Sequence, residues 1–166
     1  MTFPDGTIAK MVEVALGEVG YVEIPDNVTK YGAYTGANGK PWCGSFLDWC
    51  AHVAKLPVKP PSVVGTIWGS EQFKKLGRWH LTPKVGDFVF FDFIDDKKNV
   101  IQHVGLVVRI GKSNIRTVEG NTSDANQSNG GAVMLKTRKM GEGSFIVGYG
   151  RPVYNNSDVA LPKVAF

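Results

Sequence analysis

The chain has 166 residues, a length that fits one domain with a substantial hydrophobic core. Hydrophobic residues make up 43% and charged residues 20%, and no apolar stretch approaches the roughly 18 residues that a membrane-spanning helix needs. The net charge of +4 favours approach to anionic polymers of any kind and to membrane surfaces, but the basic residues are scattered without a run of five, which argues against nucleic-acid binding.

The first half of the chain predicts helices. Apolar residues from Ile8 to Leu16 recur at the spacing of one buried helix face, with Asp5 as the expected N-cap. Residues 25–40 are rich in turn formers and are expected to form a loop. Further helices are expected over residues 43–55 and 66–76.

The second half predicts strands, because runs rich in Val, Ile, Phe and Thr are separated by turn residues at hairpin distances. These runs cover residues 88–93, 103–110, 114–121, 132–139 and 145–152. Helices followed by antiparallel strands predict an α+β fold with N-terminal helices and a five- to six-stranded antiparallel sheet. Residues 155–166 are expected to be a tail or linker.

The two cysteines, Cys43 and Cys50, are expected to be free thiols. On one helix, a separation of seven residues puts them about 10 Å apart, which exceeds the limit of about 7 Å between the Cα atoms of a disulfide. Cys50 is expected to be a small buried apolar residue.

Cys43 is the candidate nucleophile, because it stands at the predicted start of a helix. The unpaired N–H groups and the dipole of a helix N-terminus favour the reactive thiolate, and the Cys43 N–H is placed to help hold an oxyanion. A buried structural cysteine at a loop-to-helix junction remains the alternative on this feature alone.

His103 opens an apolar strand and is the candidate partner of the thiol. A hairpin through Gly111 places His103 roughly opposite residues 119–121, and the two-residue period puts Glu119 and Asn121 on one face of the next strand. A carboxylate or amide there can orient the imidazole, while Gly105 lacks a side chain that would cover it.

The loop before Cys43 offers weaker candidates. Tyr31, Tyr34 and Trp42 are expected to line a substrate groove, with core packing an equal alternative for Trp42. Asp26 is the one acidic residue of this loop, which is too little for a cation site, so no metal or other cofactor is expected, calcium included.

Four ordered motifs carry a resemblance to a known family. They are Asn27–Gly32 with Pro41–Phe46 and Trp49, then Pro83–Phe91, then His103–Gly105, and last Thr117–Thr122. Over roughly residues 5–154 the chain resembles CHAP domains, the cysteine, histidine-dependent amidohydrolases/peptidases related to NlpC-type cell-wall peptidases. We therefore expect a CHAP catalytic domain over residues 1–154.

The resemblance implies a papain-like α+β fold and cleavage of amide bonds in bacterial peptidoglycan. It implies Cys43 as nucleophile, His103 as general base, Glu119 as the orienter of the imidazole, and Asn121 as a polar support or second orienter. Many relatives carry alanine at the position of Gly44, a difference expected to be benign.

The chain lacks the basic and apolar regions of a secretory signal at its N-terminus. Within the family it resembles, this short form without a signal looks like the catalytic module of a bacteriophage endolysin, and the resemblance implies a protein made in the host cytoplasm and acting on the wall after release. We expect a monomer that neither binds nucleic acid nor inserts into membranes.

Three functions stay open at this point. A peptidoglycan hydrolase would be either an N-acetylmuramoyl-L-alanine amidase or an endopeptidase, since the same four residues serve both. A catalytically silent wall-binding module and a cysteine acyltransferase of related fold are the alternatives.

Overall fold

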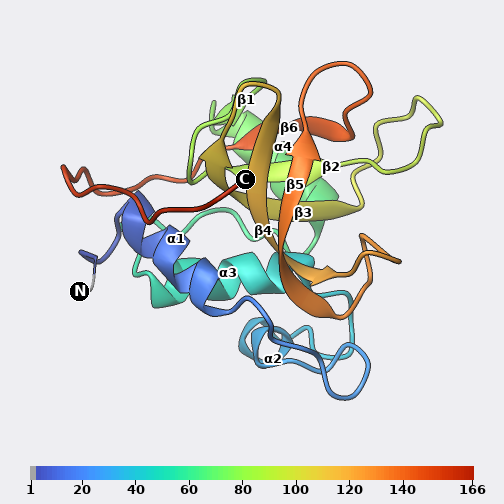
Figure 1. The fold of residues 1–166 in the computed structure, drawn as a ribbon. Coiled ribbons are helices and arrows are strands. Elements are labelled where there is room, and N and C mark those ends of the chain that lie inside the picture. The colour runs from blue at the N-terminus through green and yellow to red at the C-terminus, as the bar shows by residue number, and fades with distance from the viewer. Residues whose placement is uncertain (1–2) are drawn as a thin grey trace.

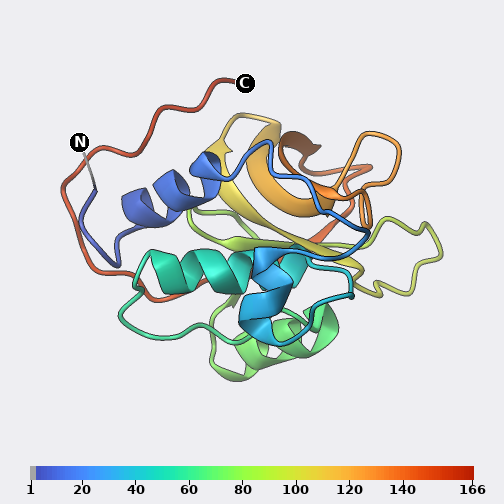
Figure 2. The same cartoon turned by 90° about the horizontal axis from the view of Figure 1, so that it is seen from below.

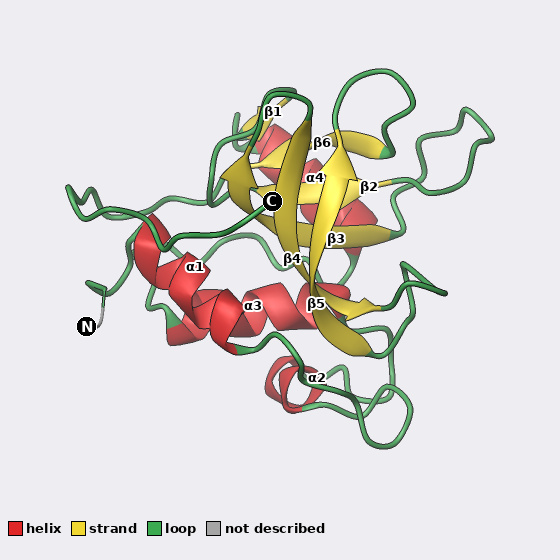
Figure 3. Cartoon of the chain, viewed as in Figure 1, coloured by secondary structure: helices red, strands yellow, loops and turns green. Residues whose placement is uncertain are grey.

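The computed structural model describes residues 3–166. This part of the chain forms four helices, α1 (Ile8–Gly17), α2 (Lys30–Thr35), α3 (Cys43–Val53) and α4 (Thr66–Lys75). It also forms six strands, β1 (Trp79–His80), β2 (Phe88–Phe91), β3 (His103–Ile110), β4 (Asn114–Thr122), β5 (Ala132–Lys139) and β6 (Ile146–Gly150). The order of helices and strands confirms the predicted α+β fold (Figures 1 and 3).

The six strands form one antiparallel sheet in the order β1-β6-β2-β3-β4-β5. Phe91 of β2 pairs with His103, and Leu106 of β3 pairs with Val118 of β4. Continuing that second register places His103 opposite Asn121, as the hairpin predicted. The strand β1 was not predicted, because two residues that pair only with β6 are too short to show an alternating pattern.

The helices begin and end close to their predicted positions, with two corrections. Thr7, and not Asp5, caps α1, because its hydroxyl accepts the Lys10 N–H at 3.1 Å. The helix α2 lies inside the stretch predicted as a loop: Thr29 caps it, and Gly36 ends it in a left-handed conformation. Six residues are too few for a helical periodicity to appear in the sequence.

The core lies mainly between α3 and the sheet, where α3 packs against β3 and β4 and supports α1 and α2 (Figure 2). Phe88 and Phe90 of β2 join this core, whereas Val89 and Phe91 belong to a second cluster on the other face of the sheet. Cys50 is fully buried in the main core, and both cysteines are free, as predicted.

Residues 155–166 carry neither helix nor strand and lie along the domain (Figure 2). The Asn155 N–H donates to the Gly6 carbonyl at 2.8 Å. Arg109 donates to the Val164 carbonyl at 2.6 Å and stacks on the Phe166 ring at 4.3 Å. The tail therefore contacts both the N-terminal segment and the hairpin of β3 and β4.

None of the helices within residues 3–166 combines the length and the apolar character needed to cross a membrane.

Candidate active site

Cys43 is the first residue of α3, and 4% of its surface is exposed. Its neighbour Trp42 caps the helix without a side-chain hydrogen bond, so the first-turn N–H groups are free of a capping side chain. These N–H groups and the helix dipole favour negative charge on an oxygen bound beside the Cys43 sulfur.

His103 is the first residue of β3, and its side chain is fully buried. The imidazole packs against the rings of Phe91 and Phe93, with centroids 5.9 and 5.7 Å away. Its Nε2 lies 2.9 Å from Glu119 Oε2 on β4. The structure thus joins His103 and Glu119 across the hairpin that the sequence predicted.

The remaining ring nitrogen of His103, Nδ1, is buried and has no hydrogen-bond partner within residues 3–166. The Cys43 side chain lies close enough to this ring to raise the pKa of the imidazole. With Nε2 held by Glu119, Nδ1 is the nitrogen left to face the thiol. The site therefore has the order thiol, imidazole, carboxylate.

The two charged members of this set have strongly shifted pKa values. Burial alone lowers the pKa of His103, but the Cys43 side chain and Glu119 outweigh it and raise this pKa from 6.5 to about 9. Burial alone raises the pKa of Glu119, but hydrogen bonds from Arg138 and His103 outweigh it and lower this pKa to about 2. At neutral pH the pair is an imidazolium facing a carboxylate.

Arg138 on β5 is a member of the site that the sequence reasoning missed. Its guanidinium donates through Nε to Glu119 Oε1 at 2.8 Å and through Nη2 to Glu119 Oε2 at 2.5 Å. Thr117 also donates its hydroxyl to Oε1, at 2.6 Å. The sequence offered only a weak signal for this contact, because β5 carries three basic residues, Lys136, Arg138 and Lys139, and their spacing does not single out Arg138.

Asn121 is fully buried, but its side chain points to the loop that follows β4. It has a left-handed conformation with φ of 54°, and its Nδ2 donates to Asn129 Oδ1 at 3.0 Å. Within the described residues it makes no hydrogen bond to His103. The β-bulge between Glu119 and Thr122 turns it away, so the structure gives Asn121 a role in holding this loop and no contact that orients the imidazole.

Tyr31, which was expected to line a groove, belongs to the core, which corrects that prediction, and for Trp42 the alternative of core packing is confirmed. Trp42 and Tyr31 are fully buried and stack on each other at 5.4 Å. The Trp42 Nε1–H donates to Glu23 at 2.6 Å, and the Tyr31 hydroxyl donates to Glu18 at 2.5 Å. Because carboxylates satisfy the polar ends of both rings, burial costs them no hydrogen bond.

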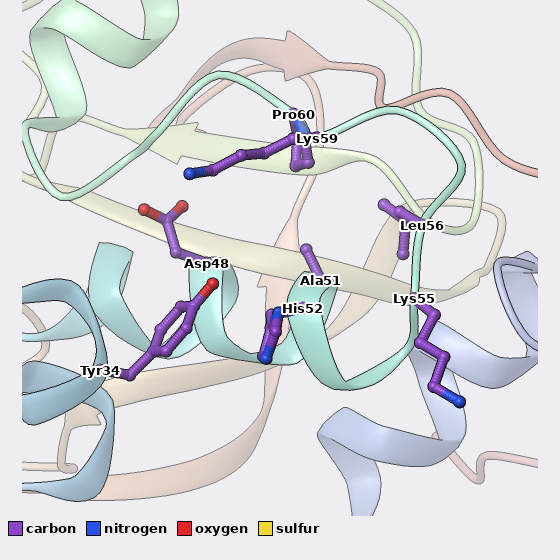
Figure 4. Close-up of a pocket in the computed structure, with 8 residues that line it drawn as sticks. All are labelled: Tyr34, Asp48, Ala51, His52, Lys55, Leu56, Lys59 and Pro60. Carbon is purple, nitrogen blue, oxygen red and sulfur yellow. The ribbon is translucent and has the colours of Figure 1, made fainter.

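Tyr34 is 42% exposed and lies in a cavity of about 380 Å³ that is lined by α3 residues beyond the nucleophile (Figure 4). Its ring stacks on His52 at 4.8 Å. The lining of this cavity includes Asp48, His52 and Lys55 but neither Cys43 nor His103. Tyr34 is therefore separate from the thiol and the imidazole.

Gly44 lies directly against the segment that follows α3, and this contact gives a structural reason for glycine at a position where many relatives carry alanine. A Cβ at Gly44 would lie 1.7 Å from the Val63 carbonyl oxygen. Asp48 fixes that segment by accepting the Val63 N–H at 3.1 Å and the Ser62 hydroxyl at 2.6 Å. The close approach therefore requires glycine next to the nucleophile.

Residues 3–166 contain no cluster of three or more His, Cys, Asp or Glu side chains suited to a metal ion.

Comparison with known proteins gives one family and one solved structure. The CHAP domain family matches residues 35–121, a span that includes Cys43, His103, Glu119 and Asn121. The comparison with curated proteins gave no match. The solved structure is that of a protein similar to a lipoprotein of the NLP/P60 family from Staphylococcus aureus, which is 14% identical with a TM-score of 0.47. The alignment covers 93% of this chain and 44% of that one. Since the family match spans more than half of its residues, the chain belongs to the CHAP domain family.

Proposed function

We propose that this protein is a cysteine-dependent peptidoglycan hydrolase that cleaves an amide bond through an acyl-enzyme. CHAP domains form a family of the peptidoglycan hydrolase type, which supplies the substrate class. The observation that carries the proposal is the buried His103–Glu119 pair, in which Nε2 and Oε2 lie 2.9 Å apart. The Cys43 side chain also raises the pKa of this imidazole.

The first half of the reaction uses the charged state of this pair. Because the pKa of His103 is about 9, the imidazole is cationic at neutral pH and favours a thiolate at Cys43. The thiolate attacks the amide carbonyl carbon, and the Cys43 N–H at the start of α3 stabilises the oxyanion. His103 then gives its proton to the leaving nitrogen, the C–N bond breaks, and a thioester remains on Cys43.

The second half returns the enzyme to its starting state. Neutral His103 takes a proton from a water molecule, which attacks the thioester carbonyl carbon. The C–S bond breaks, releasing a carboxylate product and the Cys43 thiolate. Glu119 accepts a hydrogen bond from Nε2 throughout and keeps Nδ1 directed at the sulfur.

The buried ion pair favours an enzyme over a silent wall-binding module. Burying an imidazolium and a carboxylate has a desolvation cost, and surface binding to a polymer does not require such a pair. A binding module would sediment with purified walls and release no soluble fragments. An acyltransferase would act on small acyl thioesters and leave walls intact.

We also propose that the chain acts as a monomeric, endolysin-type module on walls reached after release from the cytoplasm, without a metal cofactor. The bond is either the N-acetylmuramoyl-L-alanine amide or a peptide bond of the stem or cross-bridge. Mass spectrometry of fragments from a defined peptidoglycan distinguishes these bonds. Free lactyl carboxylates on muramic acid identify an amidase, and new amino termini within peptides identify an endopeptidase.

A further inference from the structure

We propose that Arg138 is a positioning residue that keeps Glu119 ionised and directed at His103, and so controls the charge state of the Cys43–His103 pair. This inference rests on the proposed function of those three residues. Arg138 lies on β5, beyond the span 35–121 that matches the CHAP family.

The contacts of Glu119 leave little freedom for its carboxylate. Each oxygen accepts one N–H from the Arg138 guanidinium, at 2.8 and 2.5 Å. Oε1 also accepts the Thr117 hydroxyl, and Oε2 faces His103 Nε2. A planar guanidinium that donates a hydrogen bond to each oxygen fixes the plane of the carboxylate, which a single point charge does not.

Arg138 is itself held in place. Its guanidinium stacks over the rings of Phe91 and Phe93, with its carbon 4.9 and 5.1 Å from their centroids. Its third hydrogen-bonding group donates to the Gln127 side chain. The Arg138 side chain is 8% exposed and that of Glu119 is fully buried, so water competes little for the pair.

The charge of Arg138 matters because Glu119 has no solvent to stabilise it. Arg138 is the first of the groups that lower the pKa of this carboxyl against the effect of burial. Without Arg138, this pKa rises and Glu119 takes up a proton at a higher pH. A protonated Glu119 no longer stabilises the imidazolium, so the pKa of His103 falls and the cation that favours the Cys43 thiolate is lost at a lower pH than in the parent. The deficit in thiolate is then largest at acid pH, where a thiol without a cationic partner is protonated.

A cavity of about 310 Å³ borders Arg138 and Phe91, which allows a test by chemical rescue. Arg138→Ala would open further space there for methylguanidine, a free ion that carries the lost group. Arg138→Lys keeps the charge but not the planar fork, and Arg138→Met keeps much of the volume but not the charge. Arg116→Met is the matched control, because Arg116 on β4 bonds Thr137 and not Glu119.

The primary measurement is alkylation of Cys43 by iodoacetamide at about pH 5 and about pH 7.5, with the modified cysteine located by mass spectrometry. Alkylation reports the thiolate and needs no peptidoglycan. Hydrolysis of purified walls is measured in parallel, and thermal unfolding of every variant is recorded.

The alkylation ratio is the rate at about pH 5 divided by the rate at about pH 7.5. We expect this ratio to be at least about tenfold lower in Arg138→Met than in the parent, and we expect the rate of wall hydrolysis to fall by a similar factor. Methylguanidine should restore part of both rates in Arg138→Ala, and Arg116→Met should match the parent.

The proposal is overturned if the alkylation ratio of Arg138→Met equals that of the parent. It is also overturned if Arg138→Ala loses rate together with thermal stability and methylguanidine restores neither rate. A parent that shows the alkylation pattern but leaves walls intact would contradict the peptidoglycan substrate and leave the role of Arg138 standing.

Discussion

Gly105 and Glu119 share one small space on the face of the sheet that carries His103. A Cβ at Gly105 would lie 2.7 Å from Glu119 Cγ, and the Glu119 carboxylate is held by Arg138 and Thr117 and cannot swing away. The glycine therefore makes room for the orienting carboxylate, whereas the sequence predicted only that it leaves the imidazole uncovered.

Gly105→Ala is expected to displace Glu119 and reduce kcat for wall hydrolysis by about tenfold or more, because the imidazole loses its alignment. The measurement is initial-rate kinetics on purified walls, with circular dichroism as a check on folding. Gly17→Ala is the control, since no atom lies within 4 Å of a Cβ there. A folded Gly105→Ala variant with the parent's kcat would contradict this role.

The pH dependence of the thiol follows from the raised pKa of His103. The imidazolium that favours the thiolate and donates the proton is lost as pH rises through about 9. We expect kcat/KM to fall above that pH by about tenfold for each pH unit. A profile that already falls near the ordinary histidine value of 6.5 would show that the Cys43–Glu119 environment does not hold the proton on His103.

The same shift predicts how stability depends on pH. A pKa raised in the folded state adds stability that is fully present below the unfolded value of 6.5 and is lost as pH rises to about 9. The free energy of unfolding in urea should therefore favour the parent over His103→Gln by up to about 3 kcal/mol more at low pH than above pH 9. A difference that stays constant from pH 6 to pH 10 would count against a coupled imidazolium.

Gly44→Ala is expected to destabilise the protein by about 1 to 3 kcal/mol, because its Cβ would overlap the Val63 carbonyl and Asp48 holds that segment in place. Gly17→Ala, on α1, should be neutral or stabilise by up to about 1 kcal/mol. Urea denaturation of the two variants checks both values. Equal stability of Gly44→Ala and the parent would mean that the segment moves freely.

Removal of divalent cations is expected to leave activity within about twofold of its starting value. The proposed steps use the Cys43 sulfur, the His103 imidazole and backbone N–H groups, and the loop before Cys43 holds Asp26 as its one acid. The measurement is wall hydrolysis after dialysis against EDTA, with and without added calcium. A loss that calcium alone reverses would assign a metal to the enzyme.

The sequence was most informative where local pattern and function agree. The strand of His103 and the strand of Glu119 were predictable because alternation and a turn at Gly111 set their register. The helix start at Cys43 was predictable because Pro41 and the preceding turn residues end the loop.

Three-dimensional packing decided the features that the sequence left undetermined. Trp42 and Tyr31 are in the core because Glu23 and Glu18 satisfy their polar ends, and those partners are distant in sequence. The β-bulge that turns Asn121 toward Asn129 leaves no periodic signal. Arg138 reaches Glu119 diagonally from the neighbouring strand, where Met134 is the residue that pairs with Glu119, and no spacing rule indicates such a contact.

The decisive measurement is the release of soluble fragments from purified peptidoglycan by Cys43→Ala, compared with the parent and with Cys50→Ala. Cys50 is the matched control, because it is the other free thiol and is fully buried in the core. Cys50→Ala is expected to lower the stability by about 2 kcal/mol and to leave every step of the reaction intact. The assays are therefore run well below the unfolding temperature of this variant. We predict that the parent and Cys50→Ala release fragments with identical new termini, whereas Cys43→Ala releases none above background. Release by Cys43→Ala at the parent's rate would contradict a reaction that proceeds through this cysteine.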